Sequence, residues 1–346
     1  MTTDSKSLAL RNLGAVVIGR NEGSRLAACL DSLISICHAT VYVDSGSTDD
    51  SVALARSLGV EVVVLDLSRP FTAARARNAG FTRLIEQNPT LEVVQFVDGD
   101  CEIVSGWLSI AHTFMTENSE AAVVCGRRRE RFPNQSIYNK LCDIEWDTPV
   151  GQTRACGGDA MIRTAPLQRV GGYDETVIAG EEPELCVRLR KSGFEIHRID
   201  VDMTLHDAAL SRFSQWWKRN VRSGHAFAEG AHMHGAPPER HFVKEERRAW
   251  FWGVAVPTLA IGGALPSLGL STLLLAGYPV SAGRIYRHFR NRGKGRDESA
   301  LAGVFLTLGK FAEVQGSLRY HLGRFAGRRS GIIEYKGPGA EEPKNT

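Results

Sequence analysis

The chain lacks the features of a secreted or disulfide-stabilised protein. Its seven cysteines are an odd number, and no two of them form a CxxC pair. Disulfide frameworks need paired cysteines, so we expect a reducing compartment. Residues 1–12 are polar and mixed in charge, without the apolar core of a secretory signal. With 42 basic and 39 acidic residues the net charge is only +3, which says little about partners. No nucleic-acid partner is expected.

A glycine-rich dinucleotide fingerprint is also missing. The first apolar run continues as "VVIGRNEG", with no GxGxxG after it. Because that fingerprint carries the tight turn and the close approach to a pyrophosphate, its absence argues against a dinucleotide-binding Rossmann domain.

Charge is missing altogether from Ala249 to Gly283. A membrane-spanning helix needs about 20 apolar residues, so this segment is too long for one simple span and short for two. Pro266 and several glycines interrupt it, and both flanks are basic. Basic flanks tend to stay cytoplasmic, so we expect both ends on one side. The pattern predicts a re-entrant or tight hairpin; the alternative is a buried helical pair of a soluble domain.

The first third of the chain alternates apolar runs with amphipathic stretches. Strands are expected at 14–19, 39–44, 60–66 and 92–98, and helices at 23–36, 47–59 and 72–87. Alternation at this spacing predicts parallel βαβ units and an open α/β sheet. Beyond residue 120 we expect a strand with a basic exit in "VVCGRRRERF", a short helix within the glycine-rich stretch 156–175, and helices at 181–193 and 211–230.

Polar residues stand where the predicted parallel strands end. Asn21, Asp44 and the segment Asp98–Asp100 all follow apolar runs. Ligands of such sheets bind beyond the carboxyl ends of the strands, so these positions predict a site. Gly46 permits a tight turn after Asp44, although an ordinary βα loop would look the same.

The stretch "FVDGD" places two carboxylates, Asp98 and Asp100, one residue apart. Two carboxylates at a strand exit can share a divalent cation such as Mg²⁺ or Mn²⁺, which prefers oxygen ligands and bridges to phosphates. The alternative is a solvated acidic turn.

Seven motifs occur in a specific order: "VVIGRNEG", "VYVDSGSTDDS", "AARARNAG", "FVDGD", "GGDAMIR", "VGGYDE" and "GEEPELCVRLRKSG". Together they resemble the family 2 glycosyltransferases, inverting enzymes of the GT-A fold, over about residues 13 to 230. The resemblance implies transfer of a sugar from a nucleotide-diphosphate donor to a hydroxyl, with a divalent metal.

The resemblance also implies roles for individual residues. The donor side would be formed by Asn21, Glu22, Asp44, Arg77, Asn78 and Asp98, and the loop on the acceptor side by Gly158 and Asp159. Ser45 stands where the family often has a second Asp. The metal ligands would be Asp100, Asp98 and His206, with Asp100 the more direct of the two carboxylates.

The catalytic base implied by the resemblance lies in "GEEPE". Glu181 and Glu182 match the family's Glu-Asp, whose second member accepts the proton of the acceptor hydroxyl. That position is Glu182 here, one methylene longer than Asp, and Glu181 or Glu184 remain alternatives. An acidic cluster also suits the start of a helix.

One motif of processive relatives, a Gln-rich segment ending in Trp, is missing. "SQWWKRN" stands there instead, with Trp216, Trp217, Arg219 and Arg222 nearby. The absence favours addition of one sugar over building a polymer. The tryptophans would cover the donor, face an anionic acceptor or pack in a core.

The fold expected is a mostly parallel GT-A sheet flanked by helices, followed by a helical membrane-associated region. The expected boundaries are a tail at 1–12, the GT-A domain at 13–235, the membrane-associated region at 236–330 and a tail at 331–346. The basic stretch Arg284–Arg296 suits anionic lipid headgroups.

The function expected is sugar transfer at the cytoplasmic face of the inner membrane, onto a lipid-linked saccharide used in envelope or exopolysaccharide assembly. One alternative is a polyprenyl-phosphate sugar synthase, in which the lipid phosphate itself is the acceptor. Another is a non-catalytic nucleotide-sugar-binding scaffold, favoured only by Glu in place of the usual catalytic Asp.

Overall fold

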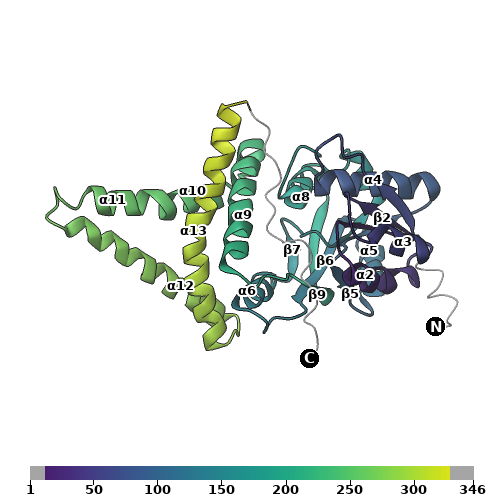
Figure 1. The fold of residues 1–346 in the computed structure, drawn as a ribbon, viewed down its shortest axis with the longest axis horizontal. Helices are drawn as coiled ribbons and strands as arrows, with labels where there is room; N and C mark the ends of the chain where they lie inside the picture. Colours follow the sequence, from purple (N-terminus) through teal and green to yellow (C-terminus); the bar gives the residue numbers. More distant parts are fainter. Residues whose placement is uncertain (1–11, 328–346) are drawn as a thin grey trace. The chain divides into compact units, whose positions relative to one another are not determined.

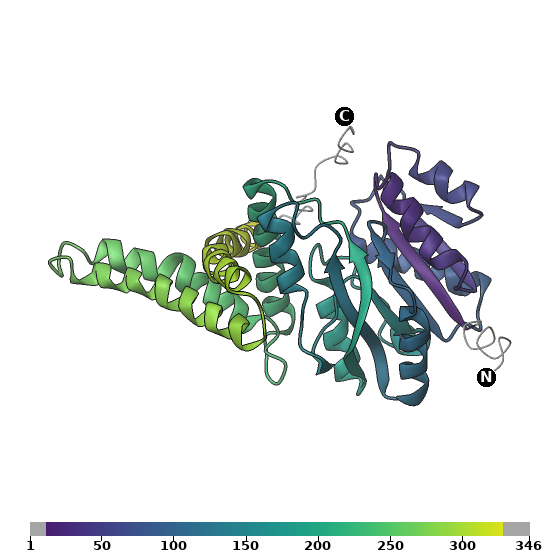
Figure 2. The same ribbon diagram turned by 90° about the horizontal axis from the view of Figure 1, so that it is seen from below.

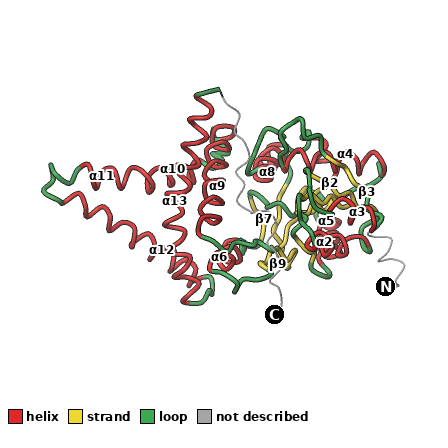
Figure 3. Tube along the Cα trace, in the orientation of Figure 1, coloured by secondary structure: helices red, strands yellow, loops and turns green. Residues whose placement is uncertain are grey.

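The computed structural model describes residues 12–327, so nearly all of the two predicted tails lies outside the described residues. The described chain divides into two compact units. The α/β unit comprises residues 12–131 and 146–209, and the helical unit comprises residues 132–145 and 210–327. Figure 3 shows strands only in the first of these and helices joined by loops in the second.

The α/β unit opens with parallel strands joined by helices. The strands are β1 (Leu13–Gly19), β2 (Ala39–Asp44), β3 (Glu61–Val64) and β4 (Val93–Asp98), and the helices are α2 (Ser24–Ile34), α3 (Ser51–Ser57) and α4 (Ala73–Gln87). The four strand predictions are confirmed, the third being shorter than expected. β1 and β4 are buried along almost their whole length, which is why they are continuous apolar runs in the sequence.

The second half of the sheet departs from the predicted pattern. Its elements are β5 (Cys101–Ile103), α5 (Trp107–Glu117), β6 (Ala121–Glu130), β7 (Gly151–Thr153), β8 (Ala160–Arg163), α7 (Thr164–Arg169), α8 (Glu181–Lys191) and β9 (Glu195–His206). The strand order is β3-β2-β1-β4-β8-β6-β9-β5, with β7 on β9. β8 runs antiparallel to both neighbours, β4 and β6.

The expectation of a mostly parallel sheet is therefore wrong. Among residues 12–327, four strand pairs are parallel and four antiparallel. The strand–helix alternation on which the expectation rested ends at β4, and antiparallel neighbours do not need a helical crossover. The fold is a mixed α/β sheet with helices on its faces (Figure 1).

The helical unit is built around two close-packed helices. Its elements are α6 (Ile137–Glu145), α9 (Phe213–His234), α10 (Val243–Trp250), the π-helical η1 (Phe251–Ala255), α11 (Val256–Gly262), the 3₁₀-helical η2 (Leu270–Ala276), α12 (Gly277–Asn291) and α13 (Arg296–Phe325). A side chain at Gly224 of α9 would collide with the backbone of Glu313 in α13. Glycine at this position lets the two helices approach closely.

The expected domain boundary at residue 235 lies later than the division of the structure, which places α9 in the helical unit. The cause is the apolar face of α9. Trp216 is 1% exposed, and its ring lies 5.1 Å from that of Phe305 and 6.4 Å from that of Tyr138. The core-packing interpretation of Trp216 is thus confirmed.

The uncharged segment 249–283 folds as a helical hairpin. Figures 1 and 2 show α11 and α12 converging on the turn that joins them through η2. The alternative of a buried helical pair is wrong for this turn, because Leu265 and Leu268 are 91% and 95% exposed. Over residues 12–327, none of the helices has both the length and the apolar character needed to cross a bilayer.

Candidate active site

The strand register brings the predicted residues to one edge of the sheet. Gly19 pairs with Asp44, and Ile18 pairs with Asp98. On the far side of β4, Phe96 pairs with Ala160, which follows Asp159 in the chain. Residues that are distant in sequence thus meet where the strands end, as expected for an open α/β sheet.

The loops after β1 and β2 lock each other through polar side chains. Asp44 Oδ2 accepts the backbone N–H groups of Gly46 and Ser47 at 3.0 and 2.9 Å. Asn21 Oδ1 accepts the N–H of Thr48 at 2.7 Å, and Asn21 adopts a positive φ of 57° that Asn tolerates. The two loops form one rigid rim, and donor binding by Asn21 and Asp44 stays a prediction.

Glu22, also predicted on the donor side, lies over the ends of β1 and β4. Its carboxylate pairs with Arg25 at 2.8 Å. A side chain at Gly99 would lie 3.2 Å from Glu22 Cγ, so Gly99 leaves room for it. Glu22 therefore borders the Asp98–Asp100 turn.

Arg77 is the centre of the site. Its guanidinium is 2% exposed and lies 2.8 Å from Asp98 Oδ1, 2.9 Å from Glu181 Oε1 and 2.8 Å from Glu182 Oε1. It also stacks on the ring of Tyr173, 5.6 Å from its centroid. Burial opposes the charge, but the three carboxylates together raise the pKa of Arg77. Arg77 therefore stays charged and joins the FVDGD turn to the acidic start of α8.

Asn78, the neighbour of Arg77 on α4, is hydrogen-bonded to the backbone of Tyr173 in the loop before α8. Its Nδ2 donates to the carbonyl of Tyr173 at 2.8 Å, and its Oδ1 accepts the N–H of Tyr173 at 2.8 Å. This pair of bonds holds Tyr173 over Arg77. Contact of Asn78 with a donor stays a prediction.

A second arginine, Arg128, was not singled out from the sequence. Its Nη2 lies 3.2 Å from Asp98 Oδ2 and 2.8 Å from Asp159 Oδ2, and its guanidinium lies 5.7 Å from the ring centroid of Trp146. The only sequence signal for it was the basic exit of β6. Asp98 is thus shared by two guanidinium groups.

Asp159 is fully buried and positions Asp98. Its Oδ1 accepts the backbone N–H of Asp98 at 3.1 Å, and its Oδ2 accepts the hydroxyl of Thr204 at 2.7 Å. A side chain at Gly158 would lie 2.8 Å from both Arg77 Nη2 and Asp98 Oδ2, so this approach requires glycine. The proposed acceptor-side role of Gly158 and Asp159 stays a prediction.

Asp100 lies against His206, as a shared metal site would require. His206 Nε2 is 3.4 Å from Asp100 Oδ2, and both side chains are buried. His206 Nδ1 lies 3.9 Å from Glu130 Oε2, and the edge of Trp146 packs at 4.8 Å between ring centroids.

The residues present therefore fit a divalent cation at Asp100 and His206. Cys101 adjoins this pair, but burial and then the charge of Asp159 raise the pKa of its thiol. A protonated thiol is a poor ligand. Asp98, held by two arginines, suits the cation less well than Asp100.

The acidic start of α8 carries the two candidate bases. Gly180 precedes the helix with a positive φ of 82°, and the helix N-terminus favours carboxylates nearby. Burial, followed by the charge of Glu181, raises the pKa of Glu182 from 4.5 to about 7, although Arg77 lowers it. A base with a pKa near 7 is well matched to proton transfer at neutral pH.

The third glutamate of this cluster, Glu184, forms an ion pair within α8. Its carboxylate accepts hydrogen bonds from Arg188 Nε at 2.8 and 3.0 Å and from Arg188 Nη2 at 2.6 Å. Glu181 has a side chain that is 4% exposed and Glu182 one that is 12% exposed. Of the three glutamates, Glu182 is the best placed to meet a substrate.

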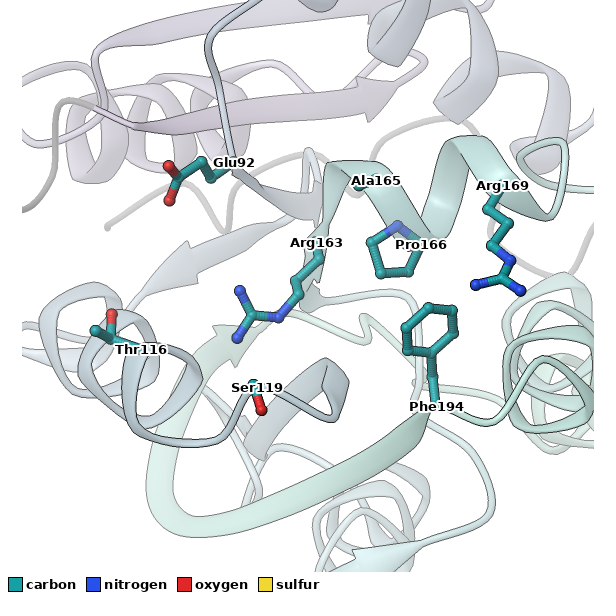
Figure 4. Close-up of a pocket in the computed structure, with 8 residues that line it drawn as sticks. All are labelled: Glu92, Thr116, Ser119, Arg163, Ala165, Pro166, Arg169 and Phe194. Atoms are coloured by element: carbon teal, nitrogen blue, oxygen red, sulfur yellow. The ribbon is translucent and has the colours of Figure 1, made fainter.

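A separate pocket lies away from this site. Figure 4 shows Arg163, Pro166 and Phe194 among the side chains that line it. It adjoins Glu92 at the start of β4, whereas Asp98 ends that strand about 20 Å away. The guanidinium of Arg163 is bonded to the carbonyl of Ala121. The pocket is distinct from the candidate active site.

Known proteins resemble the chain in sequence. Residues 15–164 match the family model for Glycosyl transferase family 2. The chain is 25% identical over 241 residues to a pre-mycofactocin glycosyltransferase of Mycobacterium tuberculosis, covering 65% of this chain and 48% of the relative. It thus spans about half the length of that relative. An uncharacterised glycosyltransferase of Rickettsia felis is 40% identical over 55 residues, or 16% of this chain and 19% of the relative.

A solved structure resembles the chain in fold. It is a mannosyltransferase of Pyrobaculum calidifontis in complex with GDP-Man and Mn²⁺, which aligns with a TM-score of 0.56 and 17% identity, over 90% of this chain and 87% of the other. At that identity the likeness shows the fold, and it confirms a GT-A-like arrangement. The sequence match shows that residues 15–164 of this chain belong to the family 2 glycosyltransferases.

Proposed function

We propose that this chain transfers a sugar from a nucleotide-diphosphate donor to an acceptor hydroxyl, with inversion at the anomeric carbon. The observation that carries the proposal is the position of Arg77. One buried guanidinium contacts Asp98, at the expected donor phosphates, and Glu182, the expected base. The residue expected at the donor phosphates and the residue expected to be the base therefore share one buried partner.

Asp100 and His206 would hold a Mg²⁺ or Mn²⁺ ion. Such a cation neutralises the charge that develops on the diphosphate leaving group. Asn21, Glu22 and Asp44 border the same strand ends and would bind the nucleoside part of the donor.

Glu182 would act on the acceptor. It accepts the hydroxyl proton as the oxygen forms its bond to the anomeric carbon and the bond from that carbon to the diphosphate breaks. The electron pair of the broken bond leaves with the diphosphate. Attack opposite the leaving group inverts the anomeric centre. Arg77 keeps the Glu182 carboxylate in place until the substrate arrives.

The acceptor we propose is a lipid-linked saccharide at the cytoplasmic face of the inner membrane, for envelope or exopolysaccharide assembly. The apolar hairpin of the helical unit and the basic stretch Arg284–Arg296 support a membrane location. Product linkage tests the acceptor. A glycosidic bond to a sugar hydroxyl fits the proposal, whereas a sugar joined directly to a lipid phosphate would indicate a polyprenyl-phosphate sugar synthase.

The donor site is tested by calorimetric titration of nucleoside diphosphates with and without Mn²⁺. Wild type is expected to bind one of them in a metal-dependent way, and Asp100→Ala is expected to weaken that binding by at least about 100-fold through loss of a ligand. Asp200→Ala, whose carboxylate is 87% exposed on β9, serves as the control. Failure of wild type to bind any nucleotide would contradict the proposal.

A second prediction concerns pH. Glu182 acts as a base only when ionised, and its pKa is about 7, so kcat/KM is expected to rise with pH and level off above about 8. Glu181→Gln removes a like charge that raises this pKa, so its profile shifts to lower pH. The pH dependence of donor hydrolysis or transfer checks both. A flat profile from pH 5 to 8 in wild type would remove Glu182 from the mechanism.

A further inference from the structure

The hairpin tip, residues 257–277, exposes an unusual density of apolar side chains. Leu265 and Leu268 are almost fully exposed at the turn. Four more large apolar residues of the tip are between 62% and 72% exposed: Leu259, Ile261, Leu270 and Leu273. A contiguous exposed apolar surface of this kind marks an interaction site.

The turn also satisfies its own polar groups. The N–H groups of Ser267, Leu268 and Gly269 donate to carbonyls at 3.0, 3.2 and 2.7 Å within the tip. Side chains do the same: the hydroxyl of Ser271 donates to the carbonyl of Ala260 at 2.8 Å, and that of Thr272 to Gly269 at 2.7 Å. A loop in water can leave such groups to solvent, whereas one in hydrocarbon must bond them internally.

An aromatic and then a basic zone follow the tip toward α13. Tyr278 donates its hydroxyl to the carbonyl of Trp252 at 2.6 Å, and the two rings lie 5.6 Å apart. Beyond them stand exposed arginines on both legs of the hairpin: Arg247, Arg248, Arg284, Arg287 and Arg290. Apolar, aromatic and basic zones in this order match the layers of a membrane interface with anionic headgroups.

The legs of the hairpin are fixed to α13. A side chain at Gly253 would lie 2.8 Å from the carbonyl of Lys310, and one at Gly303 would lie 2.7 Å from that of Ala282. The ring of Tyr278 lies 5.7 Å from that of Phe311. α13 thus supports the base of the hairpin, and the tip extends beyond it (Figure 2).

We propose that residues 257–277 insert as a wedge into one leaflet of an anionic bilayer, with the basic collar of Arg247, Arg248, Arg284 and Arg287 on the headgroups. α11 has seven residues and is therefore about 10 Å long, which suits one leaflet of a hydrocarbon core about 30 Å thick. Both legs leave on the same side. The inference rests on the proposed function, because it names the surface that would bring the enzyme to a lipid-linked acceptor.

The test is sedimentation of the full chain with vesicles of phosphatidylcholine and phosphatidylglycerol. Leu265→Asp/Leu268→Asp is expected to lower the partition coefficient by about 100-fold, since charges in the apolar layer are strongly disfavoured. Both leucines are almost fully exposed, so folding should be kept. Phe325→Asp changes an apolar residue that is 94% exposed on α13, outside the tip, and should bind like wild type.

Two further measurements separate insertion from other contacts. All seven cysteines are buried, so Leu268→Cys accepts a fluorophore selectively, and lipids carrying a quencher in the acyl chain should quench it. Arg284→Gln/Arg287→Gln should weaken binding to anionic vesicles and leave binding to neutral ones unchanged. Vesicle binding without quenching would overturn the proposal.

A second copy of the chain is the competing occupant. Sedimentation velocity without lipid would then show a dimer that Leu265→Asp/Leu268→Asp dissociates, together with no vesicle binding, and this would overturn the proposal. None of these measurements needs donor or acceptor. If wild type bound nucleotide but not vesicles, the wedge alone would be wrong. If wild type bound vesicles but no nucleotide, only the proposed activity would be wrong.

Discussion

Glu182→Gln is expected to lower kcat by about 10³-fold, within the range that a general base contributes, and to leave nucleotide binding nearly unchanged. Gln keeps the size of the side chain and an oxygen that can accept from Arg77, but it cannot take a proton. The metal-binding pair of Asp100 and His206 is untouched. Single-turnover transfer measures the chemical step, and calorimetry measures donor affinity.

Matched substitutions assign the base among the three glutamates. Glu181→Gln should keep most of the activity, because the Glu181 side chain is only 4% exposed against 12% for Glu182. Glu184→Gln should act on stability, because its carboxylate holds Arg188. If Glu181→Gln abolished turnover and Glu182→Gln did not, the base would be Glu181. Glu182→Asp, which restores the family's usual residue, tests how far the longer side chain is needed.

The donor half of the site could be predicted because it is local in sequence. A buried parallel strand is a continuous apolar run, and the polar residue that follows it stands at the sheet edge. Asn21, Asp44 and Asp98 were found in this way.

The network around Asp98 could not be predicted. Arg128 lies 30 positions from Asp98 in the sequence. Asp98 ends β4 and Arg128 is on β6, and in the sheet these two strands are separated only by β8, a strand of four residues. A strand so short within a glycine-rich stretch gives no periodic signal. Likewise, α6 and α9 belong to one helical unit although they are distant in sequence, because their apolar faces share a core.

The exposure of the hairpin turn also could not be predicted from the sequence. The absence of charged residues from Ala249 to Gly283, with several glycines and Pro266 within the segment, predicts a turn in an apolar segment. A buried helical pair and a hairpin with an exposed tip would have the same composition. Only packing decides between them. Glycines at 253 and 303 bring the legs onto α13 and leave the turn uncovered.

Arg77→Met is expected to destabilise the α/β unit by about 3–5 kcal/mol at neutral pH, as when one partner of a buried ion pair is removed. Met fills a similar volume but leaves Asp98, Glu181 and Glu182 without their shared cation. Chemical denaturation, with the two units followed separately by hydrogen exchange, measures the loss. Arg83→Met is the control on the same helix: Arg83 pairs with Glu61 at 2.6 Å but is 43% exposed, so it should contribute at most about 1 kcal/mol.

The pH dependence of this loss identifies its cause. Arg77 lowers the pKa of Glu182, so in the variant that pKa rises above about 7, while in the unfolded chain it returns to about 4.5. Below about pH 7 Glu182 is protonated in the folded form of both proteins, so it contributes no difference between them. Above about pH 7 the folded wild type releases this proton and the folded variant keeps it, so the variant continues to lose stability as pH rises. The deficit of Arg77→Met should therefore be smaller at pH 5 than at pH 8, with the increase above about pH 7, and Arg77→Met/Glu181→Gln should recover part of it. A deficit that stayed constant over this range would indicate lost packing of the Arg77 side chain on Tyr173 in place of uncompensated charge.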